Sequence, residues 1–132
     1  MAQSEPQSPL AKLPLEGIRV LDSTYVFALP YAVGLMADFG ADVIKIEGPG
    51  HPDTTRTAGL AGSYPENDLG VDWWNRPSTY NLMHRGKRSL TLDLTSERGR
   101  DLFRELVKVS DVVMENFTPR VMRRWELDYP NL

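Results

Sequence analysis

An acidic residue, Glu47, ends the apolar run Asp42–Glu47 (DVIKIE) and is followed at once by Gly48-Pro49-Gly50. In α/β proteins an acid at the end of a second strand often holds the ribose of a dinucleotide. Such a site also needs a glycine-rich turn after the first strand, because only glycine lets the backbone approach the pyrophosphate. The corresponding turn, DSTYVFALPY at residues 22–31, contains no glycine. The sequence therefore favours Glu47 as a residue that caps or salt-bridges the following loop.

Basic side chains form the second group with chemical potential. Arg85, Lys87 and Arg88 lie within four residues of one another, and Arg123 and Arg124 are adjacent. Lysine as a point charge and arginine as a bidentate donor both suit phosphate groups. A plainer interpretation also stands, since the first three fit a solvated face and the arginine pair fits the end of a helix dipole.

Metal chemistry finds little support in the sequence. His51 and His84 are the only histidines, and neither has a carboxylate or cysteine at ligand spacing. The chain contains no cysteine, which excludes disulfides and zinc–thiolate sites within it. We therefore expect no metal site, and no Ser-His-Asp arrangement can be argued from these histidines.

The segments that position these residues alternate between strand and helix. Strands are predicted at residues 18–22, 42–47, 89–94 and 111–116, and helices at residues 30–39, 96–110 and 118–127. Pro30 is expected at the first helical position, and Gly40 supplies the stop. The apolar stripe of the second helix is expected to comprise Leu102, Phe103, Leu106 and Val107. This alternation predicts an α/β fold with a Rossmann-like parallel sheet, flanking helices and a ligand end at the carboxyl ends of the strands.

Composition limits the class of protein. The 132 residues are 41% hydrophobic and 25% charged, with a net charge of −3, which is typical of a globular protein and argues against a nucleic-acid partner. No run approaches the ~20 apolar residues of a membrane span, and the first residues lack a signal-peptide pattern. A location in a reducing compartment, the cytoplasm, is therefore expected, with no membrane partner. Residues 1–14 carry three prolines and are predicted as a flexible tail, and residues 15–132 as one domain.

Four blocks of the sequence resemble, in order and spacing, the N-terminal part of the class III CoA-transferases. They are LEGIRVLD, PYAVGLMADFGADVIKIEGPG, HRGKRSLTLDLTSERG and DVVMENFTP, and the resemblance runs from Leu15 to Leu132. This CaiB/BaiF family includes formyl-CoA, carnitine and succinyl-CoA transferases and 2-methylacyl-CoA racemase. The resemblance implies a Rossmann-like CoA-binding domain with coenzyme A or acyl-CoA as a substrate and no tightly bound cofactor. It also implies an interlocked homodimer and transfer of CoA between carboxylic acids through a mixed anhydride and thioesters on one aspartate.

The resemblance places that aspartate beyond Leu132, and Asp128 does not match its position. We therefore expect no catalytic residue in this chain, and interpret it as the incomplete N-terminal part of a larger interlocked-dimer fold. Two alternatives remain open. One is a 2-methylacyl-CoA racemase-type enzyme of the same superfamily, whose histidine and aspartate would also lie beyond this chain. The other is a naturally short, non-catalytic CoA-binding protein or partner subunit.

Position by position, the resemblance also implies contacts with CoA. They are Tyr25, Val26, Phe27 and Ala28 after the first strand, Arg85, Lys87 and Arg88 before the third, Leu92 near the adenine, Asn116 and Phe117 after the fourth, and Arg124 at a phosphate-binding position.

The chain departs from the family pattern at two of these places. Gly48 stands where the family often has a phosphate-binding arginine, so Arg56 or Lys45 becomes a candidate for that charge. Phe27 stands where formyl-CoA transferases carry a glutamine. A ring cannot make the hydrogen bonds of an amide, so an acyl group bulkier or more apolar than formyl or oxalyl is expected, unless Phe27 is ordinary core.

Overall fold

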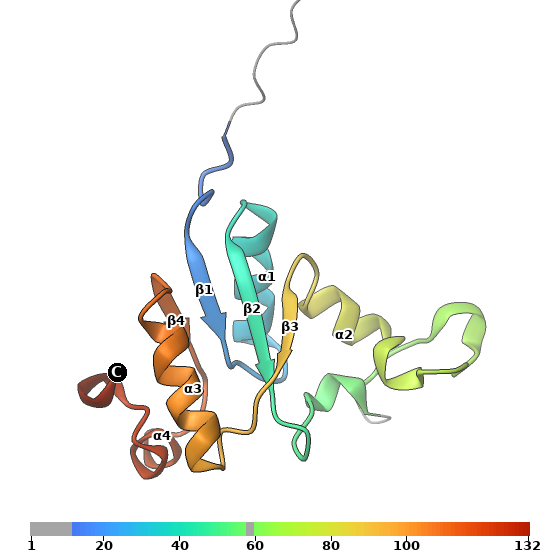
Figure 1. Cartoon of the computed structure of the whole chain (residues 1–132). Helices are drawn as coiled ribbons and strands as arrows, with labels where there is room; N and C mark the ends of the chain where they lie inside the picture. The colour runs from blue at the N-terminus through green and yellow to red at the C-terminus, as the bar shows by residue number, and fades with distance from the viewer. Residues whose placement is uncertain (1–11, 58–59) are drawn as a thin grey trace, which may run out of the picture.

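One parallel sheet forms the centre of this computed structural model, which describes residues 12–57 and 60–132 (Figure 1). Its strands are β1 (Arg19–Asp22), β2 (Asp42–Glu47), β3 (Arg88–Thr91) and β4 (Val112–Met114), in the order β3-β2-β1-β4. Every neighbouring pair is parallel, with Leu21 opposite both Ile44 and Val113. The predicted α/β fold with a parallel sheet is confirmed. Of the predicted tail at residues 1–14, only residues 12–14 are among those described.

Helices cover both faces of the sheet. They are α1 (Ala28–Asp38), α2 (Ser78–Met83), α3 (Glu97–Val107) and α4 (Pro119–Trp125), and α1 lies behind the sheet and α3 in front of it in Figure 1. Short 3-10 turns at Thr54–Arg56, Pro65–Asn67, Trp73–Asn75 and Tyr129–Asn131 complete the elements. No helix in the described part of the chain combines the length and apolar character needed to cross a bilayer.

Two apolar clusters lie on opposite sides of the sheet because successive strand residues point to opposite faces. On the α1 side, Val20 and Val43 pack with Val33. On the α3 side, Leu21 and Ile46 pack in the cluster that contains the fully buried Phe103. Val43 and Ile44 are adjacent in β2, and each packs in one of these two clusters, so the strand is covered on both faces.

The ends of α1 show how local sequence sets an element. Gly40 has a φ of +98°, a left-handed conformation that favours glycine and ends helices. Ala41 N donates to Met36 O over 3.0 Å, which satisfies a carbonyl of the last turn. The predicted stop is thus confirmed, but the helix begins at Ala28, so Pro30 is in the third helical position rather than the first.

Two other predictions need correction, and one helix was not predicted. The third strand ends at Thr91 rather than at residue 94. No helix was predicted for residues 78–83, which form α2. Leu102, expected in the apolar stripe of α3, has 44% of its surface exposed. Its neighbour Phe103 takes the central buried position, and one residue rotates a helix by about 100°, which carries Leu102 towards solvent.

The first turn of α3 depends on a close backbone approach. Ser96 caps the helix, and its hydroxyl accepts from Gly99 N at 3.0 Å. A Cβ atom added to Gly99 would lie 1.8 Å from the carbonyl oxygen of Asp93. Glycine is therefore required at this position for steric reasons, not for an unusual φ.

Gly99→Ala is expected to destabilise the protein. In an unobstructed helix the change would add roughly 0.5–1 kcal/mol of stability, but here the methyl group meets backbone, and overpacking of this kind costs about 1–3 kcal/mol. The midpoint of urea denaturation should fall. Arg98→Ala, at the exposed neighbouring position, is the matched control and should leave the midpoint nearly unchanged. A raised midpoint for Gly99→Ala would contradict the close approach.

Candidate functional site

A pocket of about 440 Å³ lies at the carboxyl edge of the sheet. Segments that follow all four strands line it: Ser23 and Tyr25 after β1, Gly48, His51, Pro52 and Thr54 after β2, Leu92 to Thr95 after β3, and Phe117, Val121, Arg124 and Trp125 after β4. Ile46 of β2 contributes to its floor. In a parallel sheet the carboxyl ends of all strands meet at one edge, which is the usual place for a ligand.

Four of the residues singled out in the sequence meet in this pocket: Tyr25, Leu92, Phe117 and Arg124. The rings of Tyr25 and Phe117 have centroids 5.5 Å apart, and Phe117 lies 5.1 Å from Trp125 with its ring nearly perpendicular. These rings and Leu92 give the pocket a largely apolar surface. Within the described residues, the Arg124 side chain has no hydrogen bond or ion pair and is the only Lys or Arg side chain that lines this pocket.

Asn116 does not line the pocket but contacts a residue that does. Its Oδ1 accepts from Tyr25 N at 2.9 Å, and its Nδ2 donates to Tyr25 O at 2.8 Å. This paired contact joins the β1–α1 loop to the segment after β4. Asn116 therefore holds Tyr25 in place through its backbone.

Val26, Phe27 and Ala28 are exposed and do not line the pocket. Val26 has a φ of +77°, which is uncommon for a β-branched residue and turns the loop sharply before α1. Phe27 has 40% of its surface exposed. Among the described residues, Phe27 is therefore not part of either apolar cluster.

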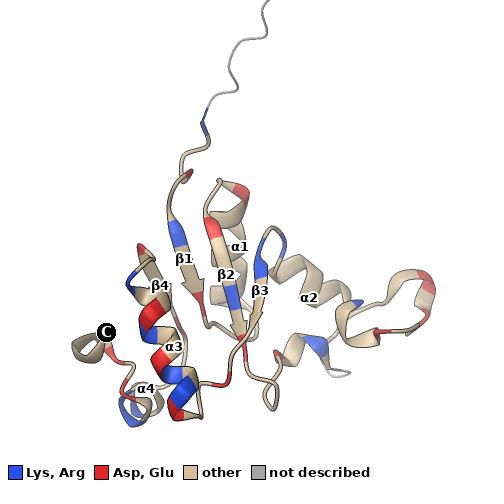
Figure 2. Cartoon of the chain, in the orientation of Figure 1, with Lys and Arg blue, Asp and Glu red and all other residues tan. Residues whose placement is uncertain are grey.

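The cations before β3 are not brought to the pocket. Arg88 and Asp42 open β3 and β2, and they pair at the amino edge of the sheet, opposite to the pocket (Figure 2). Arg85 pairs with Asp38, the last residue of α1, at 2.7 Å. Each of these arginines is thus engaged with a carboxylate away from the carboxyl edge.

The side chain of Lys87 is buried. Its Nζ lies 2.7 Å from Asp22 Oδ2 and donates to Pro30 O at 2.8 Å, with His84 Nδ1 3.3 Å away. The ammonium is enclosed by these partners, and burial lowers the pKa of Lys87. It joins β1, α1 and the segment before β3 inside the protein.

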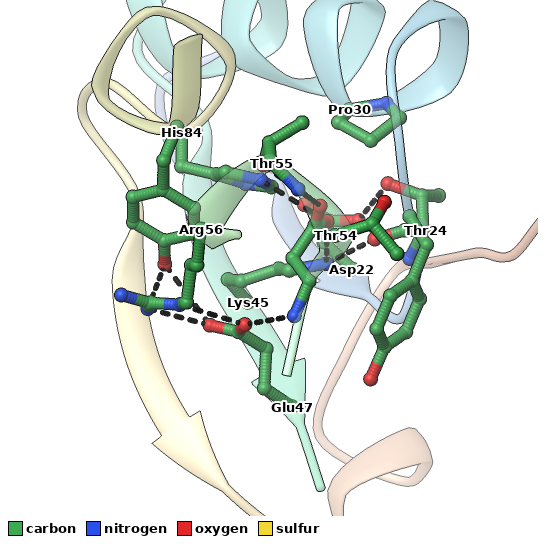
Figure 3. A network of polar contacts seen from close by, with 12 residues as sticks. Asp22, Thr24, Pro30, Lys45, Glu47, Thr54, Thr55, Arg56 and His84 are labelled. Atoms are coloured by element: carbon green, nitrogen blue, oxygen red, sulfur yellow. Dashed lines mark hydrogen bonds and ion pairs between the residues drawn. The ribbon is translucent and has the colours of Figure 1, made fainter. Parts of the chain in front are cut away.

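Glu47 faces away from the pocket because Ile46, the residue before it, faces towards it. Its carboxylate forms a paired contact with Arg56, with Nε 3.0 Å from Oε1 and Nη2 2.8 Å from Oε2 (Figure 3). It also accepts from Tyr80 Oη at 3.0 Å and from Asp53 N at 2.8 Å. Burial favours a raised pKa for Glu47, but Arg56 and the other donors outweigh it and the pKa is lowered. The prediction that Glu47 organises the following loop is confirmed.

Lys45, the other candidate for a phosphate charge besides Arg56, is also buried on this face (Figure 3). Its Nζ lies 3.5 Å from Asp53 Oδ2 and donates to Thr24 O. Asp53 Oδ2 also lies 3.4 Å from His84 Nε2, and Asp53 Oδ1 accepts from Thr55 N at 2.9 Å. Burial favours a raised pKa for Asp53, but the neighbouring His84, Thr55 and Lys45 outweigh it and the pKa is well below its usual range.

Sequence reasoning did not select His51, Asp93 and Trp125, which line the pocket. His51 and Asp93 each follow closely after a strand, so their distance from the strand ends was a usable signal. Trp125 is on the last turn of α4, and only the docking of that helix shows that it faces the pocket. The described ranges contain no group of three or more His, Asp or Glu side chains suited to hold a metal ion.

Acid should destabilise the protein through His84. Burial lowers the pKa of His84 below its ordinary 6.5, so on acidification the unfolded chain takes up a proton that the folded protein excludes. The free energy of unfolding should therefore fall as the pH drops below about 6.5, by at most about 1.4 kcal/mol per pH unit. Urea denaturation between about pH 7.5 and about pH 5.5 measures the slope. His84→Gln should reduce it, and an unchanged slope in that variant would assign the acid sensitivity to other groups.

Comparison with known proteins agrees with this arrangement. The sequence matches CoA-transferase family III over residues 15–132. The alpha subunit of succinyl-CoA–L-malate CoA-transferase from Chloroflexus aurantiacus is 38% identical over 129 residues, which are 98% of this chain and 28% of that subunit. Succinate–glutarate CoA-transferase from Agrobacterium fabrum is 42% identical over 125 residues, which are 94% of this chain and 30% of that protein.

Solved structures give the same result. The crystal structure of a CAIB/BAIF family protein from Brucella suis superposes with a TM-score of 0.75 and 37% sequence identity, over 92% of this chain and 30% of that one. The chain thus spans less than a third of the length of these relatives. The matched region contains all four strands and the pocket at their carboxyl ends, and the chain belongs to CoA-transferase family III.

Proposed function

We propose that this chain binds the CoA moiety in an enzyme that transfers CoA between carboxylic acids. The observation that carries the proposal is the pocket at the carboxyl edge, where an unpaired arginine and an apolar surface meet in a chain of this family. An apolar surface with a few polar groups is typical of small-molecule sites. The relatives cited above are named for CoA transfer, which favours transfer over the racemase alternative.

The two parts of the pocket suit the two ends of an adenosine phosphate. Leu92 and the rings of Tyr25 and Phe117 offer apolar surface to an adenine, and Arg124 offers charged donors to a phosphate. Arg85, Lys87 and Arg88 have carboxylate partners elsewhere, so the phosphate role is proposed for Arg124 alone. Phe27, exposed in the β1–α1 loop, is proposed to face an acyl group larger than formyl.

The nucleophilic aspartate is proposed to lie outside this chain. In the reaction implied by the family, its carboxylate attacks the thioester carbonyl, CoA leaves as the thiolate, and a mixed anhydride forms. The thiolate then attacks the aspartyl carbonyl and releases the first acid, and the second acid takes CoA by the reverse steps. Asp93 is the one carboxylate that lines the pocket among the described residues, and its Oδ1 is held by Thr95 N and Oγ1 at 2.9 and 2.6 Å. This is a structural turn, not an activated nucleophile.

An interlocked homodimer and a cytoplasmic location belong to the same proposal.

Arg124→Ala should weaken binding of coenzyme A by roughly ten- to a hundredfold, because it removes a charge-assisted contact worth about 1.5–3 kcal/mol. The difference should shrink as salt is raised, since exposed charge pairs are screened. Isothermal titration calorimetry with coenzyme A measures both effects. Arg123→Ala is the matched control, because Arg123 is an exposed neighbour on α4 that does not line the pocket. Equal losses in the two variants would contradict a specific phosphate contact.

NAD should bind more weakly than coenzyme A, since the turn after β1 contains no glycine and Glu47 points to the other face of the sheet. Titration of the same protein with NAD tests this directly. Tighter binding of NAD, abolished by Glu47→Gln, would contradict the CoA proposal and support a dinucleotide site.

The chain on its own is expected to show no CoA transfer, because the proposed nucleophile is outside it. The assay incubates the protein with succinyl-CoA and a dicarboxylate acceptor and follows new thioester by mass spectrometry. A covalent acyl or CoA adduct on any residue of this chain would overturn the assignment.

A further inference from the structure

Lys45 is a buried cation that contacts the pocket wall from behind. Only 1% of its surface is exposed. Its Nζ donates to Thr24 O, lies 3.5 Å from Asp53 Oδ2, and lies 4.4 Å from the centroid of the Tyr25 ring. Its partners therefore come from two different loops of the carboxyl edge, the β1–α1 loop and the loop after β2.

Tyr25 is between this buried charge and the pocket. One side of its ring meets the Lys45 ammonium, and the ring of Phe117 in the pocket wall lies 5.5 Å away. Its hydroxyl donates to His51 O at 3.1 Å, across the pocket lining. Burial, the largest effect, raises the pKa of Tyr25 to about 12, so this hydroxyl keeps its proton and remains a donor at neutral pH.

We propose that Lys45 is a positioning residue for the pocket: its ammonium fixes the Thr24–Tyr25 loop and, through Tyr25, the wall against which the ligand binds. The inference rests on the proposed CoA site for its functional meaning, while the structural link is independent of the ligand. The Lys45 ammonium meets the pocket lining at the inner side of the Tyr25 ring, so it acts on the ligand site indirectly.

The alternative is that Lys45 only neutralises Asp53. Lys87 illustrates such a role, because its side chain is equally buried and pairs with Asp22 at 2.7 Å. Lys87, however, contacts Pro30 O and His84 and not Tyr25. The two lysines thus share a buried side chain and an aspartate partner, and they differ in contact with Tyr25 of the pocket wall.

Hydrogen exchange followed by NMR separates the two roles. The Tyr25 amide donates to Asn116 Oδ1 at 2.9 Å and reports directly on the position of the loop. In Lys45→Met it should exchange about tenfold faster or more than in Lys87→Met, because only the first variant loses a direct charge-assisted bond to the loop. Lys87 reaches the loop only through Asp22, which keeps its own bonds to Thr24 in that variant. Similar exchange of the Tyr25 amide in both variants would show a shared structural effect and overturn the proposal.

Titration with coenzyme A tests whether Lys45 affects ligand binding. Lys45→Met should lower affinity by about tenfold, with the Tyr25 amide mobile in the same sample. If the wild-type protein binds no coenzyme A, the proposed function fails, while the exchange experiment still decides the role of Lys45. If the wild type binds and Lys45→Met binds equally well, the positioning role is wrong.

Tyr25→Leu keeps the proposal testable if Lys45→Met does not fold. It removes the ring that the ammonium contacts and the hydroxyl that meets His51 O, but leaves every buried charge paired. Weaker coenzyme A binding, again by about tenfold, is expected. Unchanged affinity would show that the position of Tyr25 does not matter and would overturn the proposal.

Discussion

Two buried residues of β2, Lys45 and Glu47, carry charges that must be paired inside the protein. The arrangement of the loops at the carboxyl edge of the sheet depends on this pairing. Lys45 and Glu47 point to the same face of the sheet, since they are two residues apart in a strand. A buried charge is costly unless it is paired and hydrogen-bonded. The pairs are Lys45 with Asp53, Lys87 with Asp22, and Arg56 with Glu47. Three cations and three anions balance, and burial keeps His84 neutral by lowering its pKa.

This pairing determines the course of the loop after β2. Asp53 and Arg56 must return to the strand from which the loop left, so the segment from Gly48 to Arg56 folds back across the end of the sheet. His51 and Thr54 are thereby placed along the pocket. The charges occupy the α1 and α2 side, and Ile46 faces the α3 side, so a polar interior and an apolar pocket exist on either side of one strand.

Local signals in the sequence predicted β2 and the stop at Gly40, because the apolar run and the left-handed glycine act within a few residues. The locations of the cations, in contrast, depend on carboxylates that are distant in the sequence. Lys87 and Arg88 are adjacent, yet Lys87 is buried against Asp22 and Arg88 reaches Asp42 at the opposite edge. No local pattern distinguishes them, because the partners are more than forty residues away. Likewise α2 has six residues and no side-chain cap, so neither periodicity nor capping indicated it.

If the pocket binds the adenine and phosphates of CoA, selection of the acid must come from other parts of the enzyme. Adenine and phosphates are the same in every acyl-CoA, so the contacts proposed at Leu92 and Arg124 would not distinguish one acid from another. Binding energy from such remote groups can instead hold the thioester in position for reaction. That requires a rigid pocket wall, because a loosely held carrier would not orient its distant acyl end. The buried ammonium behind Tyr25 supplies this rigidity without occupying space in the pocket, which a cation in the wall itself would do.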